Sequence, residues 1–214
     1  DSLKKLKAII IVGPVEEDTK EFIEEQKVTA LYLKSLGVQV FEFYHPNAKW
    51  ADIAKASVGA NILVYAGHGS VSVFCVTNQI VESEKIISDL KLHKNALVIL
   101  NHACESAGAS AADMKEITQI EALRRVGDYA KTFVSTNGGA YYANNYDYSV
   151  VPFLESFFKR QNIKTIYTKA ASEWTKIEVF KKYKYDSNFD IGIASKEASD
   201  DYYICTITEN GKSR

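Results

Sequence analysis

The chain has 214 residues, which fits a single domain, because domains average roughly 150 residues and α/β domains often exceed that length. Hydrophobic residues make up 46% and charged residues 25%, a globular composition that excludes a disordered or fibrous chain. The 26 basic and 27 acidic side chains give a net charge of −1, which indicates no basic surface for nucleic acid. No apolar run approaches the ~20 residues of a membrane span. We therefore expect one domain over residues 1–214, with neither nucleic acid nor a membrane as partner.

The cysteines and the first residue bear on where the protein works. Cys75, Cys104 and Cys205 are too few and too odd in number for a disulfide framework, so at least one thiol is free unless it pairs between chains. The chain opens with Asp1 instead of Met, which fits the removal of a signal peptide or propeptide and equally a shortened chain. Among these we favour a secreted, processed protein. The sequence leaves the oligomeric state open.

Strands alternate with helices along the chain. Short apolar runs predict strands at 7–12, 38–44, 61–66, 96–100, 131–136 and 201–208, and a small hairpin at 71–76 and 79–81. Helical spacing predicts helices at 17–36, 51–57, 82–90, 112–130, 147–160 and 168–183. The apolar face expected for the helix at 112–130 consists of Met114, Ile117, Ile120, Leu123 and Val126. This order predicts an α/β three-layer sandwich, with a mainly parallel central sheet of about six strands and helices on both faces.

The residues that follow two successive predicted strands carry the strongest chemical signal. Gly67-His68-Gly69 follows the strand at 61–66, and Ala103-Cys104 comes shortly after the strand at 96–100. Parallel sheets carry their functional residues at the carboxyl ends of the strands, so His68 and Cys104 can face each other if the two strands are neighbours. A thiolate beside an imidazole is the nucleophile of cysteine enzymes, and the small Gly69 leaves its N–H open to an oxyanion.

At these residues the chain resembles the caspase-like cysteine peptidases of clan CD, which include caspases, metacaspases, legumains, gingipains, clostripain and separase. The resemblance lies in an apolar strand followed by His68-Gly69 and a second one followed by Ala103-Cys104, and in strand order it extends over residues 6–140. The first motif is most similar to metacaspase and bacterial caspase-like sequences, and Ala103-Cys-Glu-Ser106 is similar to legumains. The resemblance implies a caspase-like fold and a cysteine endopeptidase acting on a peptide or protein substrate. In it His68 would be the general base, Cys104 the nucleophile, and the N–H groups of Gly69 and Cys104 the oxyanion hole.

Three departures limit what the resemblance implies about substrate choice. Caspases carry Gln before Ala-Cys and Arg, Gln or Gly after it, whereas this chain has His102 and Glu105. Legumains carry Asp before His-Gly, where this chain has Gly67. His68 and Cys104 are also closer in sequence than the ~50 residues of caspases. Neither the Asp preference of caspases nor the Asn preference of legumains therefore carries over.

Loops on the same edge of the sheet are expected to select the substrate. The candidates are Glu105, Asn137 and Gly138, the loop from there to Asp147, and the acidic run Glu16–Asp18. An acidic group at this place would favour Arg or Lys at the cleavage site by charge pairing. The acidic run fits a helix N-terminus equally well. The Tyr-rich and Asn-rich stretch 141–148 fits either substrate contact or packing.

Other interpretations stay open. His102 is a second candidate base, because in an extended segment it would lie on the same side as Cys104. A strand-end histidine that makes a backbone hydrogen bond is the alternative that we favour for it. A caspase-like domain that binds or scaffolds without cutting is the second functional hypothesis, and a flavodoxin-like or receiver-like module is the third. The histidines and cysteines show no metal-ligand spacing, so neither a metal nor a cofactor is expected.

Overall fold

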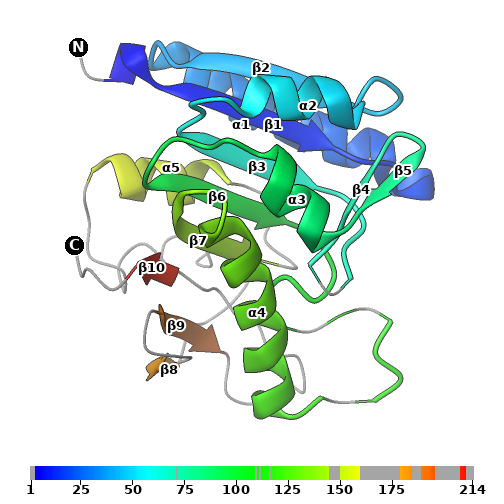
Figure 1. Cartoon of the computed structure of the whole chain (residues 1–214), viewed down its shortest axis with the longest axis vertical. Helices are drawn as coiled ribbons and strands as arrows, with labels where there is room; N and C mark the ends of the chain where they lie inside the picture. Colours follow the sequence, from blue (N-terminus) through cyan, green and yellow to red (C-terminus); the bar gives the residue numbers. More distant parts are fainter. Residues whose placement is uncertain are drawn as a thin grey trace.

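The computed structural model describes residues 3–70, 72–108, 110, 112–115, 117–144, 150–159, 179–184, 189–195 and 208–210, the last three ranges as backbone only. The described part is centred on a five-stranded sheet in the order β2-β1-β3-β6-β7 (Figure 1). These strands are β1 (Lys7–Val12), β2 (Gln39–Tyr44), β3 (Ile62–Ala66), β6 (Ala96–Asn101) and β7 (Gly138–Asn144). Every pairing in this sheet is parallel, as the sequence predicts.

Two small antiparallel sheets accompany the central one. β4 (Phe74–Val76) and β5 (Gln79–Val81) form the predicted hairpin. β8 (Val179–Lys184), β9 (Phe189–Ser195) and β10 (Thr208–Asn210) form the other sheet. β8 contradicts the end of the helix predicted at 168–183, whose earlier part lies outside the described residues. The strand predicted at 201–208 also lies outside them, except for Thr208, which begins β10.

Helices cover both faces of the central sheet and make a three-layer α/β arrangement (Figure 1). The helices are α1 (Thr19–Ser35), α2 (Trp50–Ser57), α3 (Ser83–Asp89), α4 (Gln119–Val134) and α5 (Val151–Phe158). Leu33 of α1 and Phe153 of α5 belong to the core on one face. The core on the other face includes residues of α2, α3 and α4. Short 3-10 helices at Leu3–Lys5 and Glu16–Asp18 flank β1.

The three inner strands are buried on both faces. All of β3 and β6 is buried, and so is β1 after its first residue. Strands with helices on both sides are continuously apolar instead of alternating, which is why the runs Ile9–Val12, Ile62–Ala66 and Ala96–Leu100 could be recognised in the sequence.

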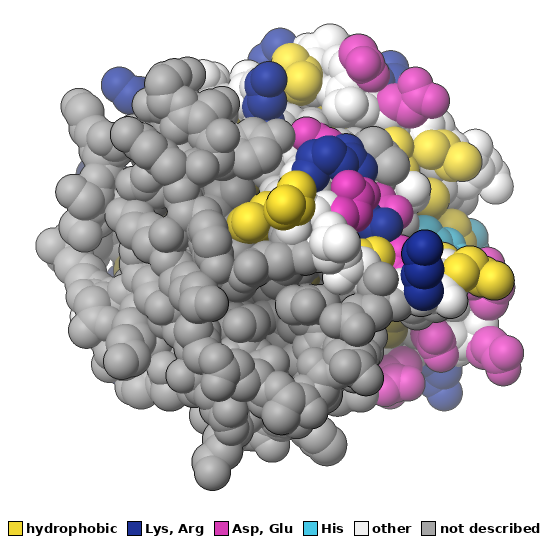
Figure 2. Space-filling view, turned by 90° about the horizontal axis from the view of Figure 1, so that it is seen from below, with side chains coloured by type: hydrophobic (Ala, Val, Ile, Leu, Met, Phe, Trp, Pro, Cys, Tyr) yellow, Lys and Arg dark blue, Asp and Glu magenta, His cyan; other side chains and the backbone are white. Residues whose placement is uncertain are grey.

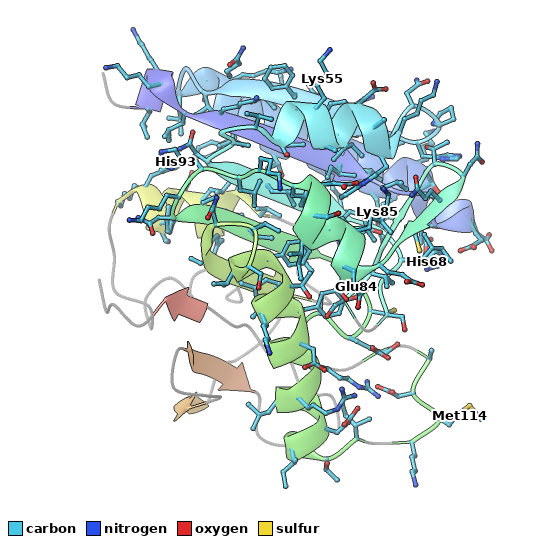
Figure 3. The ribbon with its side chains drawn as sticks, in the orientation of Figure 1. Lys55, His68, Glu84, Lys85, His93 and Met114 are labelled. Atoms are coloured by element: carbon cyan, nitrogen blue, oxygen red, sulfur yellow. The ribbon has the colours of Figure 1, made fainter. Side chains whose placement is uncertain are left out.

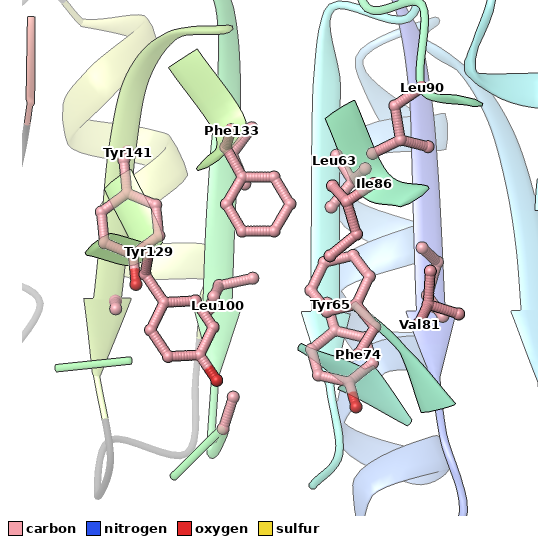
Figure 4. Close-up of a cluster of buried hydrophobic side chains, with 14 of the residues drawn as sticks. Leu63, Tyr65, Phe74, Val81, Ile86, Leu90, Leu100, Tyr129, Phe133 and Tyr141 are labelled. Atoms are coloured by element: carbon pink, nitrogen blue, oxygen red, sulfur yellow. The ribbon is translucent and has the colours of Figure 1, made fainter. Parts of the chain in front are cut away.

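A cluster of aromatic side chains fills the core between the sheet and α4 (Figure 4). The ring of Tyr65 stacks on Phe74 at 4.1 Å between centroids, and Phe74 stacks on Phe133 at 5.1 Å. Phe133 in turn lies 6.2 Å from Tyr141. These rings join β3, the hairpin, α4 and β7 into one packed layer, so the elements around the carboxyl ends of the strands share a common support.

α4 differs from the helix expected at 112–130. It begins at Gln119, preceded by Thr118, whose Oγ1 accepts a hydrogen bond from the N–H of Glu121 at 3.2 Å. Of the expected apolar face, Val126 is buried and Ile117 and Leu123 pack against the core, whereas Met114 and Ile120 are 99% and 81% exposed. The buried residues of the helix are Ala122, Val126, Gly127, Tyr129, Ala130, Thr132, Phe133 and Val134. Met114 was misassigned because it precedes the helix, and Ile120 because it lies in the exposed first turn.

The last strand of the central sheet also differs from expectation. Residues 131–134 complete α4, so the strand predicted at 131–136 is wrong, and β7 takes its place in the sheet. Phe133 lies seven residues, or about two helical turns, beyond Val126 and therefore continues the buried face of the helix. Asn137, with a φ of 76°, turns the chain into β7. The two glycines that open β7 lower its strand propensity and concealed it in the sequence.

The other predicted elements are confirmed with small shifts of their ends. α5 occupies part of the helix predicted at 147–160, whose residues 147–149 lie outside the described part. No helix among the described residues is long and apolar enough to cross a membrane.

We expect Phe133→Ala to lower the free energy of unfolding by about 3–5 kcal/mol, because it removes a fully buried ring from the aromatic cluster. Met114→Ala is the control, since this side chain is exposed and the change should stay within about 0.5 kcal/mol. Urea denaturation followed by fluorescence measures both. Equal effects of the two substitutions would contradict the assigned buried face of α4.

Candidate active site

The two predicted site segments lie at one edge of the central sheet. β3 and β6 are neighbours, and their last residues, Ala66 and Asn101, are partners in the parallel pairing. Gly67-His68-Gly69 and Ala103-Cys104 therefore leave the sheet at the same edge. Figure 3 shows His68 at this edge and His93 at the opposite one. The neighbouring strands that the sequence analysis required are present.

The backbone of Gly69 lies directly against the loop that carries Cys104. A Cβ atom built on Gly69 would be 2.7 Å from the Cys104 carbonyl oxygen, 2.7 Å from the Tyr129 hydroxyl and 3.1 Å from the Cβ of Ala103. Real Cβ atoms essentially never approach other atoms within 3.0 Å, so a side chain at this position would push the two loops apart. The structure thus brings Gly69 and Cys104 together, and the absence of a side chain at Gly69 makes this approach possible.

His68 contacts a carboxylate that the sequence analysis placed in other roles. Its Nε2 lies 2.9 Å from Oε2 of Glu16, and the two side chains are 44% and 76% exposed. Glu16 follows β1, the other neighbour of β3, so it emerges at the same edge. The Thr19 hydroxyl accepts from the N–H of Val15 at 2.7 Å and donates to the Glu16 carbonyl at 3.1 Å. This turn presents the carboxylate to the imidazole, and the position after β1 was the only sequence signal for it.

Two free thiols lie among the described residues, Cys75 on β4 and Cys104 after β6, and both are partly exposed. Burial raises the pKa of the Cys75 thiol, and the negative charge of Glu16 raises it further. Because the thiolate is the reactive form, the raised pKa lowers the reactivity of Cys75 at neutral pH. It provides an internal reference for the reactivity of Cys104.

Three buried tyrosines of the aromatic cluster, Tyr65, Tyr129 and Tyr141 (Figure 4), bind the backbone of the site loops through their hydroxyls. Each donates to a backbone carbonyl of a site loop: Tyr65 to His68 at 2.6 Å, Tyr129 to Cys104 at 3.3 Å, and Tyr141 to Ser106 at 2.6 Å. Burial raises the pKa of all three phenols, so they remain protonated donors at neutral pH. The sequence analysis missed this set because tyrosines in apolar segments are usually packing residues.

Arg125 of α4 binds two residues of the loop that follows Cys104, Gly108 and Asp113. Its guanidinium donates to both carboxylate oxygens of Asp113, at 3.0 and 2.9 Å, and to the Gly108 carbonyl at 3.1 Å. The hydrogen bonds from Arg125 lower the pKa of the Asp113 carboxyl. Such a bidentate contact fixes the orientation of the Asp113 carboxylate as well as its distance from Arg125, so it holds Asp113 at a defined place on the helix.

Glu105, the third predicted substrate contact, lies on this same side of the molecule. Its φ of 66° places it in the left-handed region, and it lies within electrostatic reach of Arg124, Arg125 and Tyr129. Arg124 also pairs with acidic neighbours on α4. Figure 2 shows basic and acidic side chains interspersed on the coloured part of the lower face. The negative charge of Glu105 is therefore partly balanced by arginines before any substrate is present.

The structure does not bring Asn137 and Gly138 to this edge. Gly138 pairs with Ala96 at the start of β6, and the Asn137 carbonyl accepts from the N–H of Asn95 at 3.0 Å. Both residues therefore lie at the amino ends of the strands, opposite His68. The expectation placed them after a strand at 131–136, and it fails because that segment belongs to α4. Tyr141 and Tyr142 are buried in β7, and residues 145–149 of the predicted loop, including Asp147, lie outside the described part.

His102 packs against α1. Its φ of 63° breaks the extended geometry on which the alternative base rested. The imidazole stacks on Phe22 at 4.5 Å, and its Nε2 lies 2.9 Å from the Glu25 carboxylate. The Glu25 carboxylate is thus one partner of His102, where the sequence analysis favoured a backbone partner. At 8% exposure, the His102 side chain is poorly placed to meet a substrate.

Comparison with known proteins gives no match: no family model, no curated protein and no solved structure is significantly similar to this chain. Among the described residues, no three His, Cys, Asp or Glu side chains are grouped so that they could hold a metal ion. The site is therefore defined by its own geometry.

We expect Asp113→Asn to lower the free energy of unfolding by about 1–2 kcal/mol near pH 7, because Arg125 loses one charged partner and keeps only its contact with Glu121. The pKa of Asp113 is lowered in the fold, so its carboxylate stabilises the protein above the unfolded-state pKa and ceases to do so as pH falls through the folded one. The difference between wild type and variant should therefore shrink below about pH 4. Urea denaturation across this range measures it, and a difference independent of pH would refute the assignment.

Proposed function

We propose that this chain is a cysteine endopeptidase of the caspase-like type, which hydrolyses peptide bonds through a His68/Cys104 dyad. The observation that carries the proposal is the close contact between the two loops, in which Gly69, next to His68, packs against the Cys104 carbonyl. A partly exposed thiol, an imidazole and backbone N–H groups at one sheet edge are the parts that cysteine hydrolysis needs. The parallel sheet with helices on both faces supports the fold that the motif implies.

The proposed reaction proceeds through an acyl-enzyme. His68 takes the proton of the Cys104 thiol, and the thiolate attacks the carbonyl carbon of the scissile bond. The C–N bond then breaks as His68 returns the proton to the leaving amine. Water, deprotonated by His68, attacks the thioester, and the C–S bond breaks as His68 returns that proton to the Cys104 sulfur. The N–H groups of Gly69 and Cys104 would stabilise the oxyanion at each addition step.

Glu16 gives the imidazole a defined role in this scheme. Its carboxylate accepts at Nε2 of His68, which favours the tautomer that carries the proton on Nε2. Nδ1 is then the ring nitrogen that can accept the thiol proton. An imidazole whose Nε2 is hydrogen-bonded to a carboxylate also needs less reorientation to act as base through Nδ1.

Engagement of Glu16 weakens the argument for a basic cleavage site. A carboxylate that already pairs with His68 is not available to a substrate Arg or Lys in the same way. Of the three acidic residues after β1, Glu17 and Asp18 form no ion pair with another described residue and remain the candidates for charge pairing. The preferred cleavage residue is therefore a question for direct assay.

The decisive test uses tagged peptidyl acyloxymethyl ketones with Arg, Lys, Asn or Asp at the reactive end, followed by mass spectrometric mapping. We expect labelling at Cys104, complete loss in Cys104→Ala and strong reduction in His68→Ala. Cys75→Ala should label like wild type, because burial and Glu16 keep the Cys75 thiol protonated. The preferred probe identifies the cleavage residue. Absence of labelling by every probe, with iodoacetamide modifying Cys75 as fast as Cys104, would favour the scaffolding alternative.

We further expect Glu16→Gln to lower kcat by about tenfold or more, because the amide no longer supplies the charge that orients and stabilises the imidazole. Glu17→Gln is the matched control, since it removes the neighbouring exposed carboxylate. Steady-state kinetics on the preferred peptide compare the two. If both substitutions leave kcat unchanged, the contact between Glu16 and His68 plays no part in turnover.

A further inference from the structure

Two peptide groups at the candidate site have carbonyl oxygens that accept hydrogen bonds from buried hydroxyl groups. In a trans peptide the carbonyl of one residue and the N–H of the next point in opposite directions within one plane. A hydrogen bond that holds the carbonyl therefore also sets the direction of the following N–H. The N–H groups of Gly69 and Cys104 belong to the peptides whose carbonyls come from His68 and Ala103.

The first of these peptides is held by Tyr65. The ring of Tyr65 is fully buried, and its hydroxyl lies 2.6 Å from the His68 carbonyl oxygen and 3.1 Å from that of Cys75. A hydroxyl carries one proton, and the shorter distance assigns it to His68. The same hydroxyl accepts from the N–H of Cys75 at 3.0 Å. A Cβ atom on Gly67 would lie 2.6 Å from this oxygen, so the hydroxyl fits only because Gly67 has no side chain.

The second peptide is held by Ser106. Its Oγ donates to the Ala103 carbonyl at 2.5 Å, and its N–H donates to the same oxygen at 3.1 Å. Ser106 is fully buried, and its own carbonyl accepts from the Tyr141 hydroxyl at 2.6 Å. Glu105, with its φ of 66°, closes the turn between Ala103 and Ser106. The Ala103–Cys104 peptide therefore has two hydrogen bonds on its carbonyl side.

Tyr129 joins the two loops to each other. Its hydroxyl donates to the Cys104 carbonyl at 3.3 Å, and the same hydroxyl lies against the backbone of Gly69, where a built Cβ atom would be 2.7 Å away. Within the described part of the chain, the N–H groups of Gly69 and Cys104 donate no backbone hydrogen bond. Both N–H groups are held in direction, and no described backbone carbonyl occupies them.

We propose that Tyr65 and Ser106 are positioning residues, whose hydroxyls aim the N–H groups of Gly69 and Cys104 at the oxyanion of the reacting carbonyl. The inference rests on the proposed function and extends it, because it assigns the orientation of the oxyanion hole to two buried side chains that never touch the substrate. Their removal leaves the thiol and the imidazole in place and misaligns the donors. The effect should appear in kcat and not in the reactivity of the thiol itself.

The test compares Tyr65→Phe and Ser106→Ala with two controls that remove hydroxyls elsewhere. Tyr44→Phe deletes a half-buried hydroxyl that donates to Glu42 at 2.7 Å on β2. Ser57→Ala deletes a buried hydroxyl that, like that of Ser106, donates to the carbonyl three residues earlier, at 2.7 Å. Circular dichroism establishes that each variant is folded at the assay temperature. Each is then measured for kcat on the preferred peptidyl coumarin amide and for the rate of Cys104 alkylation by iodoacetamide.

Iodoacetamide reacts at a saturated carbon and develops no oxyanion, so its rate reports the thiol alone. We expect kcat to fall by about tenfold to a hundredfold in Tyr65→Phe and Ser106→Ala, since loss of a whole oxyanion donor costs about 10²–10³. Alkylation of Cys104 should match wild type in both variants. Both controls should keep kcat and alkylation. If Tyr65→Phe does not fold, Ser106→Ala makes the same test on the other loop.

The outcomes separate the inference from the function on which it rests. A wild-type protein that cleaves no peptide overturns the proposed function, and the inference falls with it. A wild type that cleaves, with variants of unchanged kcat, overturns the inference alone. A fall in kcat matched by an equal fall in alkylation also overturns it, because the hydroxyls then act on the thiol and not on the oxyanion.

Discussion

The candidate site depends on the register in which β3 pairs between β1 and β6. Ala66 is the partner of Val12 on one side and of Asn101 on the other, so three strands end together. Successive side chains of a strand point to opposite faces, and a slip of one residue would turn Tyr65 from the α4 side to the α1 side. Ile62 and Val64, which belong to the core beneath α1, would then face α4. The register therefore decides where the Tyr65 hydroxyl meets the His68 loop.

The loops approach each other because side chains are absent at the crossing points. This holds for Gly67 and Gly69 and also for Gly13. The Cys75 carbonyl oxygen occupies the space of a side chain at Gly13, since a Cβ atom there would lie 1.9 Å from it. Gly13 follows β1, so the hairpin that carries Cys75 packs onto the first loop as well. Segments that are distant in sequence thus come together on backbone contacts. A site built on backbone contacts has few side chains that could adjust, which favours a defined geometry for its N–H groups.

The sequence predicted much of the fold because the signals are local. The continuous apolar runs of β1, β3 and β6 identify buried parallel strands, and their order gives the edge at which His68 and Cys104 emerge. The errors concern segments whose local signal conflicts with the fold. Phe133 lies in a β-branched, apolar run that suits a strand, yet packing against Phe74 keeps it in α4. Because this strand was misplaced, Asn137 and Gly138 were assigned to the wrong edge.

Contacts between distant segments could not be predicted in the same way. Glu16 was recognised as acidic and close to the functional edge, but its pairing with His68 depends on the turn that Thr19 stabilises. The partner of His102 depends on which face of α1 meets the end of β6, and the left-handed backbone at His102 turns the ring toward Phe22. Neither geometry follows from the periodicity of the sequence, because both arise where the regular strand has ended.

At the ends of the parallel strands, buried loop carbonyls lack hydrogen-bond donors, and the tyrosine hydroxyls supply them. Beyond the last ladder hydrogen bond, loop carbonyls that face the core have no strand partner, and a buried carbonyl without a donor is costly. A phenylalanine in place of Tyr65 or Tyr141 would fill the same space in the aromatic layer but leave the carbonyl of His68 or Ser106 without its hydroxyl donor. A buried hydroxyl would likewise be unfavourable without an acceptor. Each tyrosine therefore joins two requirements, a ring that packs the core and a donor that completes the loop above it. The backbone of the candidate site is in this way part of the core, while the His68 imidazole stands at its surface and is held by a single exposed carboxylate.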